Sequence, residues 1–265
     1  VWGAVLLCRP PVGQPAAYHG FADQRVLFGI PNFGDVVSNL GFLLVGCLGL
    51  TSIVFGRGGR VFDERWHAWP YLFFFGAVAL VGIGSGYYHW APSDPTLVWD
   101  RATMTLAFMS LFGAVVADRV DLRAGVRSLP ALLLIGSASV GWWALSGDVG
   151  AYLVLSQIWP LTSILLIVFL LFPSKDGVIR YIDGRYVALI ALLYGGAIAF
   201  EQLDHAVFAW TRGVVSGHSL KHLAAACSVG VVLPMLLTRP RRQRAVDTAG
   251  ETGNKNPELR GCLET

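Results

Sequence analysis

Charged side chains are scarce in this sequence. They make up 14% of its 265 residues, whereas 54% of the residues are hydrophobic; soluble globular domains carry roughly a quarter charged residues. The apolar runs are spread evenly along the chain. This composition predicts an all-α integral membrane protein that forms a single polytopic helical bundle, and it argues against soluble domains.

Cysteine is also rare. The four cysteines show no CxxC spacing, and two of them, Cys47 and Cys227, lie inside apolar runs, so neither a disulfide framework nor a thiolate zinc site is indicated. The net charge of +3 comes from arginine clusters in short loops and near the C-terminus. That pattern is typical of membrane topology signals and not of a nucleic-acid-binding surface, so no nucleic-acid partner is predicted.

Seven apolar runs are long enough, or nearly so, to cross a bilayer of roughly 30 Å as helices. They cover about residues 33–55, 70–89, 96–117, 130–146, 151–172, 186–203 and 217–237. Pro70 and Pro130 stand where a helix can begin without losing a hydrogen bond, whereas Pro160 and Pro234 fall inside runs and are expected to kink them.

Arginines alternate between the connecting loops. Loops one–two, three–four and five–six and the tail hold most of the positive charge, so the positive-inside rule places these loops and the C-terminus in the cytoplasm and the N-terminal side outside. Residues 1–8 would span only about 12 Å as a helix. We interpret them as the trimmed end of a signal anchor or additional first helix, with a short disordered start as the alternative.

Three units follow from this pattern. Residues 1–32 form a linker and an amphipathic segment, residues 33–238 the seven-helix domain, and residues 239–265 a basic and then polar tail that is expected to be disordered.

Histidines stand out at the ends of the apolar runs. His218 and His222 open the last run four residues apart, which places them on one helix face with Cβ atoms about 6 Å apart. His89 ends the second run, one turn after Ser85, and Asp100 begins the third. The predicted topology brings all five to one depth on the non-cytoplasmic side, and because each intramembrane charge costs about 2.5–3.5 kcal/mol, such a set indicates a function or tight pairing.

Three imidazoles are the ligand set of many catalytic zinc sites, in which the fourth position is left to water with a pKa near 7. We therefore predict His89, His218 and His222 as metal ligands. Asp100 would accept the water's proton and pass it to a leaving amine, and Ser85 would hydrogen-bond the water or the developing oxyanion.

Each residue also has a simpler interpretation. Two helix histidines can hydrogen-bond to neighbours, a membrane serine can bond to its own backbone, and Asp100 can pair with the adjacent Arg101. For the remaining polar residues at this depth we expect a helix-end role for Asp35, a snorkelling or paired side chain for Lys221, and helix-end or ligand-supporting roles for Glu201, Asp204 and His205.

An ordered set of motifs resembles a known family. Val37-Ser38-Asn39, Ser85-x-x-x-His89, Asp100 and His218-x-x-x-His222, in that order on seven helices, are similar to the alkaline ceramidases and their wider hydrolase superfamily, which includes the adiponectin receptors. The resemblance covers about residues 23–237. It implies zinc-dependent hydrolysis of the amide of a ceramide-like lipid to a fatty acid and a sphingoid base, with zinc on the three histidines and Ser85 and Asp100 at the zinc-bound water.

Eukaryotic members of this family also have a calcium site built from acidic residues before and at the first helix. Here the stretch offers Asp23 and Asp35, and Asn32 stands where a glutamate is expected, which argues against calcium.

A lipid could enter such a site sideways from the bilayer, with acyl chains held by apolar walls that include Phe73, Phe74 and Phe75. Two other functions remain open at this point. One is a receptor or sensor on the same scaffold with a structural zinc and little or no turnover. The other is a metal or proton transporter, which would need polar groups continuing to the cytoplasmic side, where the helices are nearly all apolar.

Overall fold

The computed structural model describes residues 10–62, 64–172 and 182–238. This part of the chain consists of helices and loops and contains no strand. Seven helical spans are long and apolar enough to cross a membrane, namely Phe33–Phe55, Arg65–Trp90, Asp94–Arg119, Leu122–Ser146, Gly150–Leu171, Gly184–Gln202 and Gly217–Leu237. The seven-helix bundle is thus confirmed, whereas the anchor or additional helix predicted for residues 1–8 and the tail predicted for residues 239–265 lie outside the described residues.

Several spans consist of more than one helix. The first contains α2 (Phe33–Val37) and α3 (Leu40–Phe55), and short helical turns, η2 (Gly58–Val61) and η3 (Arg65–Ala68), lead into α4 (Trp69–Trp90). Then follow α5 (Asp94–Arg119), α6 (Leu122–Ser146), α7 (Gly150–Tyr152), η4 (Leu153–Ile158), α8 (Trp159–Leu166), η5 (Ile167–Leu171), α9 (Gly184–Gln202), α10 (Asp204–Trp210), α11 (Gly217–Gly230) and α12 (Val232–Leu237).

The predicted start of the fourth span was wrong. Helix α6 begins at Leu122, capped by Asp121, whose Oδ1 accepts a hydrogen bond of 2.7 Å from Ala124 N, and Pro130 lies inside the helix. The two turns before Pro130 are helical because they bury Gly125 and Leu129, four residues apart, on one face of the helix. Arg123 and Arg127, which precede the apolar run, are exposed, so they do not oppose helix formation.

The two interior prolines do interrupt their helices, as predicted. Residues Leu153–Ile158, which end two residues before Pro160, form a π-helical segment, and the last span breaks between α11 and α12 at Val231, three residues before Pro234. The missing N–H of proline removes one hydrogen bond of the regular ladder, and the preceding turns adjust to it.

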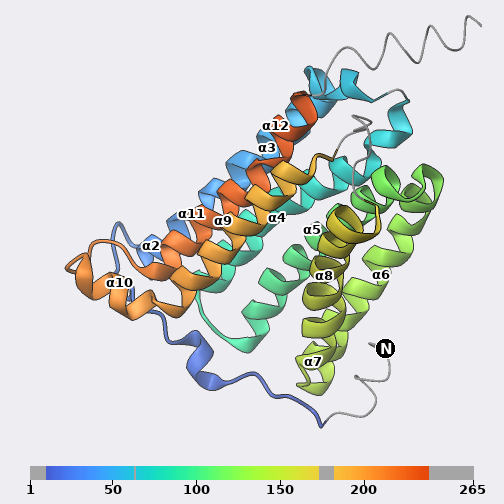
Figure 1. The fold of residues 1–265 in the computed structure, drawn as a ribbon. Helices are drawn as coiled ribbons and strands as arrows, with labels where there is room; N and C mark the ends of the chain where they lie inside the picture. Colours follow the sequence, from blue (N-terminus) through green and yellow to red (C-terminus); the bar gives the residue numbers. More distant parts are fainter. Residues whose placement is uncertain (1–9, 63, 173–181, 239–265) are drawn as a thin grey trace, which may run out of the picture.

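The helices pack in chain order around the histidines. Helix α4 lies between α3 and α5, α6 packs against α5, and α11 closes the other side between α3 and α9 (Figure 1). Large apolar side chains cover the outer faces, with Phe55, Leu134, Leu145, Leu170 and Leu192 each more than two-thirds exposed. An apolar exterior of this kind requires a lipid environment, so the chain is a multi-pass membrane protein.

The N-terminal segment crosses one end of the bundle. It contains a short turn, η1 (Ala16–His19), and runs in Figure 1 from the loop before α7 towards α2. Val12 N donates a 3.0 Å hydrogen bond to Asp148 Oδ1, and Ala22 N donates one of 2.9 Å to Asp204 Oδ2 before α11. This segment therefore covers the end of the bundle at which α4 ends and α5 and α11 begin.

Candidate metal centre

Three histidines from two helices meet beneath the N-terminal segment. His89 lies at the end of α4, and His218 and His222 lie in the first two turns of α11. All three are buried, and one ring nitrogen from each lies within 4.8 Å of the others. These three side chains could hold one metal ion.

The spacing fits a metal ion. His218 Nε2 lies 3.2 Å from His89 Nε2, and two nitrogens bound tetrahedrally at about 2.0–2.1 Å from a zinc ion are about 3.3–3.4 Å apart. The ring centroids of the three imidazoles are pairwise 4.7 Å apart. Three neutral imidazoles converging in a buried site are a donor set suited to zinc and to other divalent transition metals.

The first span fixes the orientation of His222. His222 Nδ1 lies 2.8 Å from Ser38 Oγ, and that hydroxyl donates to the Asp35 carbonyl at 3.1 Å. The hydroxyl oxygen can therefore accept a hydrogen bond from Nδ1–H, and in that tautomer the Nε2 lone pair of His222 is free for a metal. Asn39 Nδ2 lies 3.3 Å from the same Nδ1 and 2.7 Å from the Asp35 carbonyl.

Asp204 positions the start of α11 and thereby His218. Its Oδ1 accepts a 2.8 Å hydrogen bond from His218 N, and its Oδ2 accepts that from Ala22 N. At Gly217 a Cβ atom would collide with the Phe200 carbonyl oxygen and the backbone of Asp204, so glycine permits this close approach. Asp204 thus supports a ligand histidine, as expected, but through the backbone and not through the imidazole.

Phe21 and Asn32 complete the surroundings of His89. The Phe21 ring centroid lies 4.6 Å from that of His89 and 4.5 Å from that of His218, and Phe21 is itself buried. Asn32, in a left-handed conformation with φ of 46°, donates a 2.8 Å hydrogen bond to the His89 carbonyl. The phenyl ring shields the histidines from the aqueous end of the bundle.

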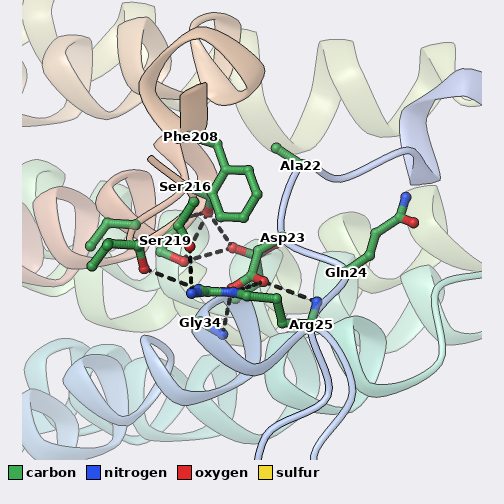
Figure 2. Close-up of polar contacts among 12 residues, drawn as sticks. Ala22, Asp23, Gln24, Arg25, Gly34, Phe208, Ser216 and Ser219 are labelled. Carbon is green, nitrogen blue, oxygen red and sulfur yellow. Dashed lines mark hydrogen bonds and ion pairs between the residues drawn. The ribbon is translucent and has the colours of Figure 1, made fainter. Parts of the chain in front are cut away.

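A network around Asp23 and Arg25 holds the N-terminal segment in this place (Figure 2). Arg25 donates to Asp23 Oδ1 at 2.7 Å and to the Gly213 and Val214 carbonyls, and Gly34 N donates to Asp23 Oδ2 at 2.9 Å. Burial raises the pKa of Asp23, but the hydrogen bonds from Arg25 and Gly34 outweigh it and hold this pKa below its usual value. Both oxygens of Asp23 therefore accept hydrogen bonds from the protein.

Asp35 does not cap its own helix. Its Oδ1 accepts hydrogen bonds of 2.7 Å from Ser216 Oγ and Ser219 Oγ, and Ser216 is the N-cap residue of α11. Asp35 thus lies in the first turn of its own helix, as expected for a carboxylate at a helix end, and its side chain also bonds to the N-cap residue of α11. The contact joins the start of the first span to the helix that carries two of the three histidines.

One cavity of about 420 Å³ connects the histidines with Asp100 and Ser85, which line it together with all three imidazoles. The Ser85 hydroxyl and the Asp100 carboxylate are neighbours on the cavity wall, and both side chains are buried. The cavity also extends past Phe74, Met104, Leu161 and Ile190 towards the arginine-rich end of the bundle. Of the three phenylalanines proposed as walls only Phe74 lines it: Phe75 is in the core, and Phe73 is on the outer surface.

Asp100 and Arg101, whose pairing was the simpler interpretation of Asp100, attract each other but form no direct ion pair among the described residues. Within the described residues the Arg101 guanidinium donates to two hydroxyls, from Nη2 to Tyr18 at 2.6 Å and from Nη1 to Tyr152 at 3.2 Å. Its central carbon also lies 5.1 Å from both ring centroids. Lys221, in contrast, forms an ion pair with Glu201. A paired side chain was one of the two roles expected for it.

The other histidines are outside the centre. His19 lies between the Tyr88 hydroxyl, 2.9 Å from its Nδ1, and Asp94, and His205 Nε2 lies 3.1 Å from the Gly20 carbonyl. His205 therefore belongs to the contacts of the N-terminal segment and does not support a ligand. Sequence reasoning assigned no function to Phe21 or Tyr18, because single aromatic residues before the first span carry no distinguishing pattern.

Comparison of the chain with protein-family models, with curated proteins and with solved structures gives no match.

Proposed function

We propose that this protein is a membrane-embedded, zinc-dependent amidase that hydrolyses ceramide or a related N-acyl lipid. The observation that carries the proposal is the convergence of three histidines, Asp100 and Ser85 on a single cavity whose remaining length is mainly apolar. The sequence resemblance to the alkaline ceramidases makes ceramide the first substrate to test. By the positive-inside rule the site lies towards the non-cytoplasmic leaflet.

The number of ligands favours catalysis over a purely structural metal. Structural zinc sites are closed by four protein ligands, whereas catalytic sites use three and leave one position open. Here three histidines converge, and the next polar groups on the cavity wall, Asp100 and Ser85, are suited to proton transfer and hydrogen bonding. A receptor or sensor with a structural zinc would not need a carboxylate in that position.

The side chains have distinct roles in this reaction. His89, His218 and His222 would hold the ion, and zinc in such a site activates water as a nucleophile near neutral pH. Asp100, oriented by the Ser85 hydroxyl, accepts a proton from the attacking water and delivers it to the amide nitrogen. A C–O bond forms, the C–N bond breaks, and the products are a carboxylic acid and an amine.

The cavity accommodates a long acyl chain. Along α4 it is lined from His89 and Ser85 to Phe74, a distance of about 22 Å at 1.5 Å per residue for fifteen residues. Phe21 restricts access from the aqueous end, so the lipid enters from the bilayer with its amide at the histidines and its chain directed to the opposite end. Such an apolar slot with a few polar groups at one end is typical of lipid sites.

The test is hydrolysis by the purified protein in detergent. Ceramide and a panel of other N-acyl lipids are incubated with it, with and without a chelator, and the released fatty acid and bound metal are measured. We expect about one zinc per chain, chelator-sensitive release, and a loss of at least about a hundredfold in the Asp100→Asn variant.

The matched control is Asp121→Asn, which changes the cap of α6 at the opposite end of the bundle and should leave hydrolysis unchanged. Zinc bound stoichiometrically by a protein that hydrolyses none of the lipids would favour the receptor. Full activity in Asp100→Asn would refute the proposed mechanism.

A further inference from the structure

Arg101 is a buried cation on the wall of the cavity. It is 7% exposed, and in the part of the chain that the structure describes both of its hydrogen bonds go to neutral tyrosine hydroxyls. Among the described residues no carboxylate lies within ion-pair distance of the guanidinium, and Asp100, the preceding residue, attracts it only from further away. A charge buried at membrane depth is costly unless an anion compensates it.

The guanidinium also has unused donors. Of its five N–H groups, one from each terminal nitrogen is used by Tyr18 and Tyr152, and Nε is buried with no partner. Three N–H groups therefore remain, among them that of Nε, and a guanidinium with several donors left can bind a carboxylate through two hydrogen bonds. The two tyrosines hold the side chain in place by hydrogen bonds and by cation–π contacts.

The location of Arg101 limits what the anion can be. Arg101 directly follows Asp100 in α5, and both line the cavity that contains the histidines, as does Tyr18. An anion bound there is near the scissile bond and far from the distal end of an acyl chain. A carboxylate one or two bonds from the amide fits this position, and so does the carboxylate that amide hydrolysis creates.

We propose that Arg101 binds a lipid carboxylate inside the cavity, supplied either by an N-acyl amino acid as substrate or by the released fatty acid. This inference rests on the proposed amidase function. It deepens that function by adding an anionic subsite, which a neutral ceramide leaves unfilled until hydrolysis produces the acid.

The experiment measures carboxylate preference in two ways. In the first, binding of palmitate and of hexadecanol to the purified protein is compared, which requires no turnover. In the second, kcat/KM is compared for N-palmitoylglycine and its uncharged isostere N-palmitoylglycinamide. We expect the wild-type protein to bind palmitate at least about tenfold more tightly than hexadecanol, and Arg101→Gln to remove most of that preference.

Arg101→Lys retains the charge without the planar guanidinium and should keep part of the preference for carboxylates. This variant still tests the inference if Arg101→Gln does not fold. Arg127→Gln, an exposed arginine at the other end of the bundle, makes the same change in net charge and should keep all of it. If Arg101→Gln loses only the preference for palmitate over hexadecanol, the carboxylate comes from the fatty acid product. If it also loses the preference for N-palmitoylglycine over its amide, the carboxylate comes from the substrate. Wild-type preferences in folded Arg101→Gln would overturn the inference, even if the protein hydrolyses ceramide.

Discussion

His222 Nδ1 lies 2.8 Å from the Oγ of Ser38, a residue 184 positions earlier in the chain. This contact joins the first span to the seventh and fixes which nitrogen of the imidazole carries the proton. Such supporting contacts set the orientation and basicity of a metal-binding histidine. Metal affinity should therefore depend on residues that do not touch the ion.

Ser38→Ala should weaken metal binding. Without the hydroxyl, His222 loses the acceptor that keeps its proton on Nδ1, and we expect the metal dissociation constant to rise about 10–100-fold. Competition with a chromophoric chelator measures it. The control is Ser128→Ala, because the Ser128 hydroxyl donates to the Gly125 carbonyl in α6. Equal metal affinities in the two variants would contradict this account of the tautomer.

Removing a ligand should abolish binding outright. In His218→Ala only two imidazoles remain, so the metal content measured by elemental analysis should fall from about one per chain to below about 0.1. His205→Ala removes an exposed histidine that bonds to the Gly20 carbonyl, and it should retain the metal. If His218→Ala kept a full equivalent, the ion would be bound elsewhere.

Asp204→Asn should destabilise the protein and disturb the metal centre. An amide offers one oxygen in place of two, so either His218 N or Ala22 N would face an NH₂ group. Leaving one buried donor unpaired costs about 1–3 kcal/mol. A lower thermal midpoint in detergent together with reduced metal affinity is expected, whereas a lower midpoint with unchanged affinity would limit Asp204 to a role in folding.

Ala107→Phe should shorten the acyl chains that the protein accepts. Ala107 lines the cavity seven residues after Asp100, about 10 Å further from the histidines, and a phenyl ring there would fill the slot. We expect hydrolysis of long-chain N-acyl lipids to fall at least about tenfold while C8 substrates are retained. Leu134→Phe, on the lipid-facing surface, serves as the control, and an unchanged chain-length profile in Ala107→Phe would place the acyl chain elsewhere.

The Asp23 and Arg25 contact should fail in acid. The pKa of Asp23 is held below its usual 3.8 in the folded protein, so its stabilisation is present above 3.8 and is lost as the pH falls through the lower folded value. The difference in thermal midpoint between the wild-type protein and Asp23→Asn should be constant between about pH 5 and 8 and should narrow below about pH 4. Narrowing already at pH 6 would contradict this assignment.

The number of membrane spans could be predicted because it depends on local composition. A run of about twenty apolar residues needs a helix to satisfy its backbone in lipid, whatever its neighbours are. The start of α6 was predicted too late because this prediction also relied on local composition. Charged residues interrupt the apolar pattern at the beginning of the helix, although Gly125 and Leu129 are buried there on one face.

The sequence by itself determined that His218 and His222 share one helix face, and that His89 and Asp100 stand at the same end of the bundle, because helix periodicity and span order fix both. Only the tertiary structure decided that Ser38 orients His222, that Asp204 acts through the backbone of His218, and that Arg101 donates to Tyr18. These contacts join residues up to 184 positions apart. Their geometry depends on how helices rotate and approach one another, which no local pattern encodes.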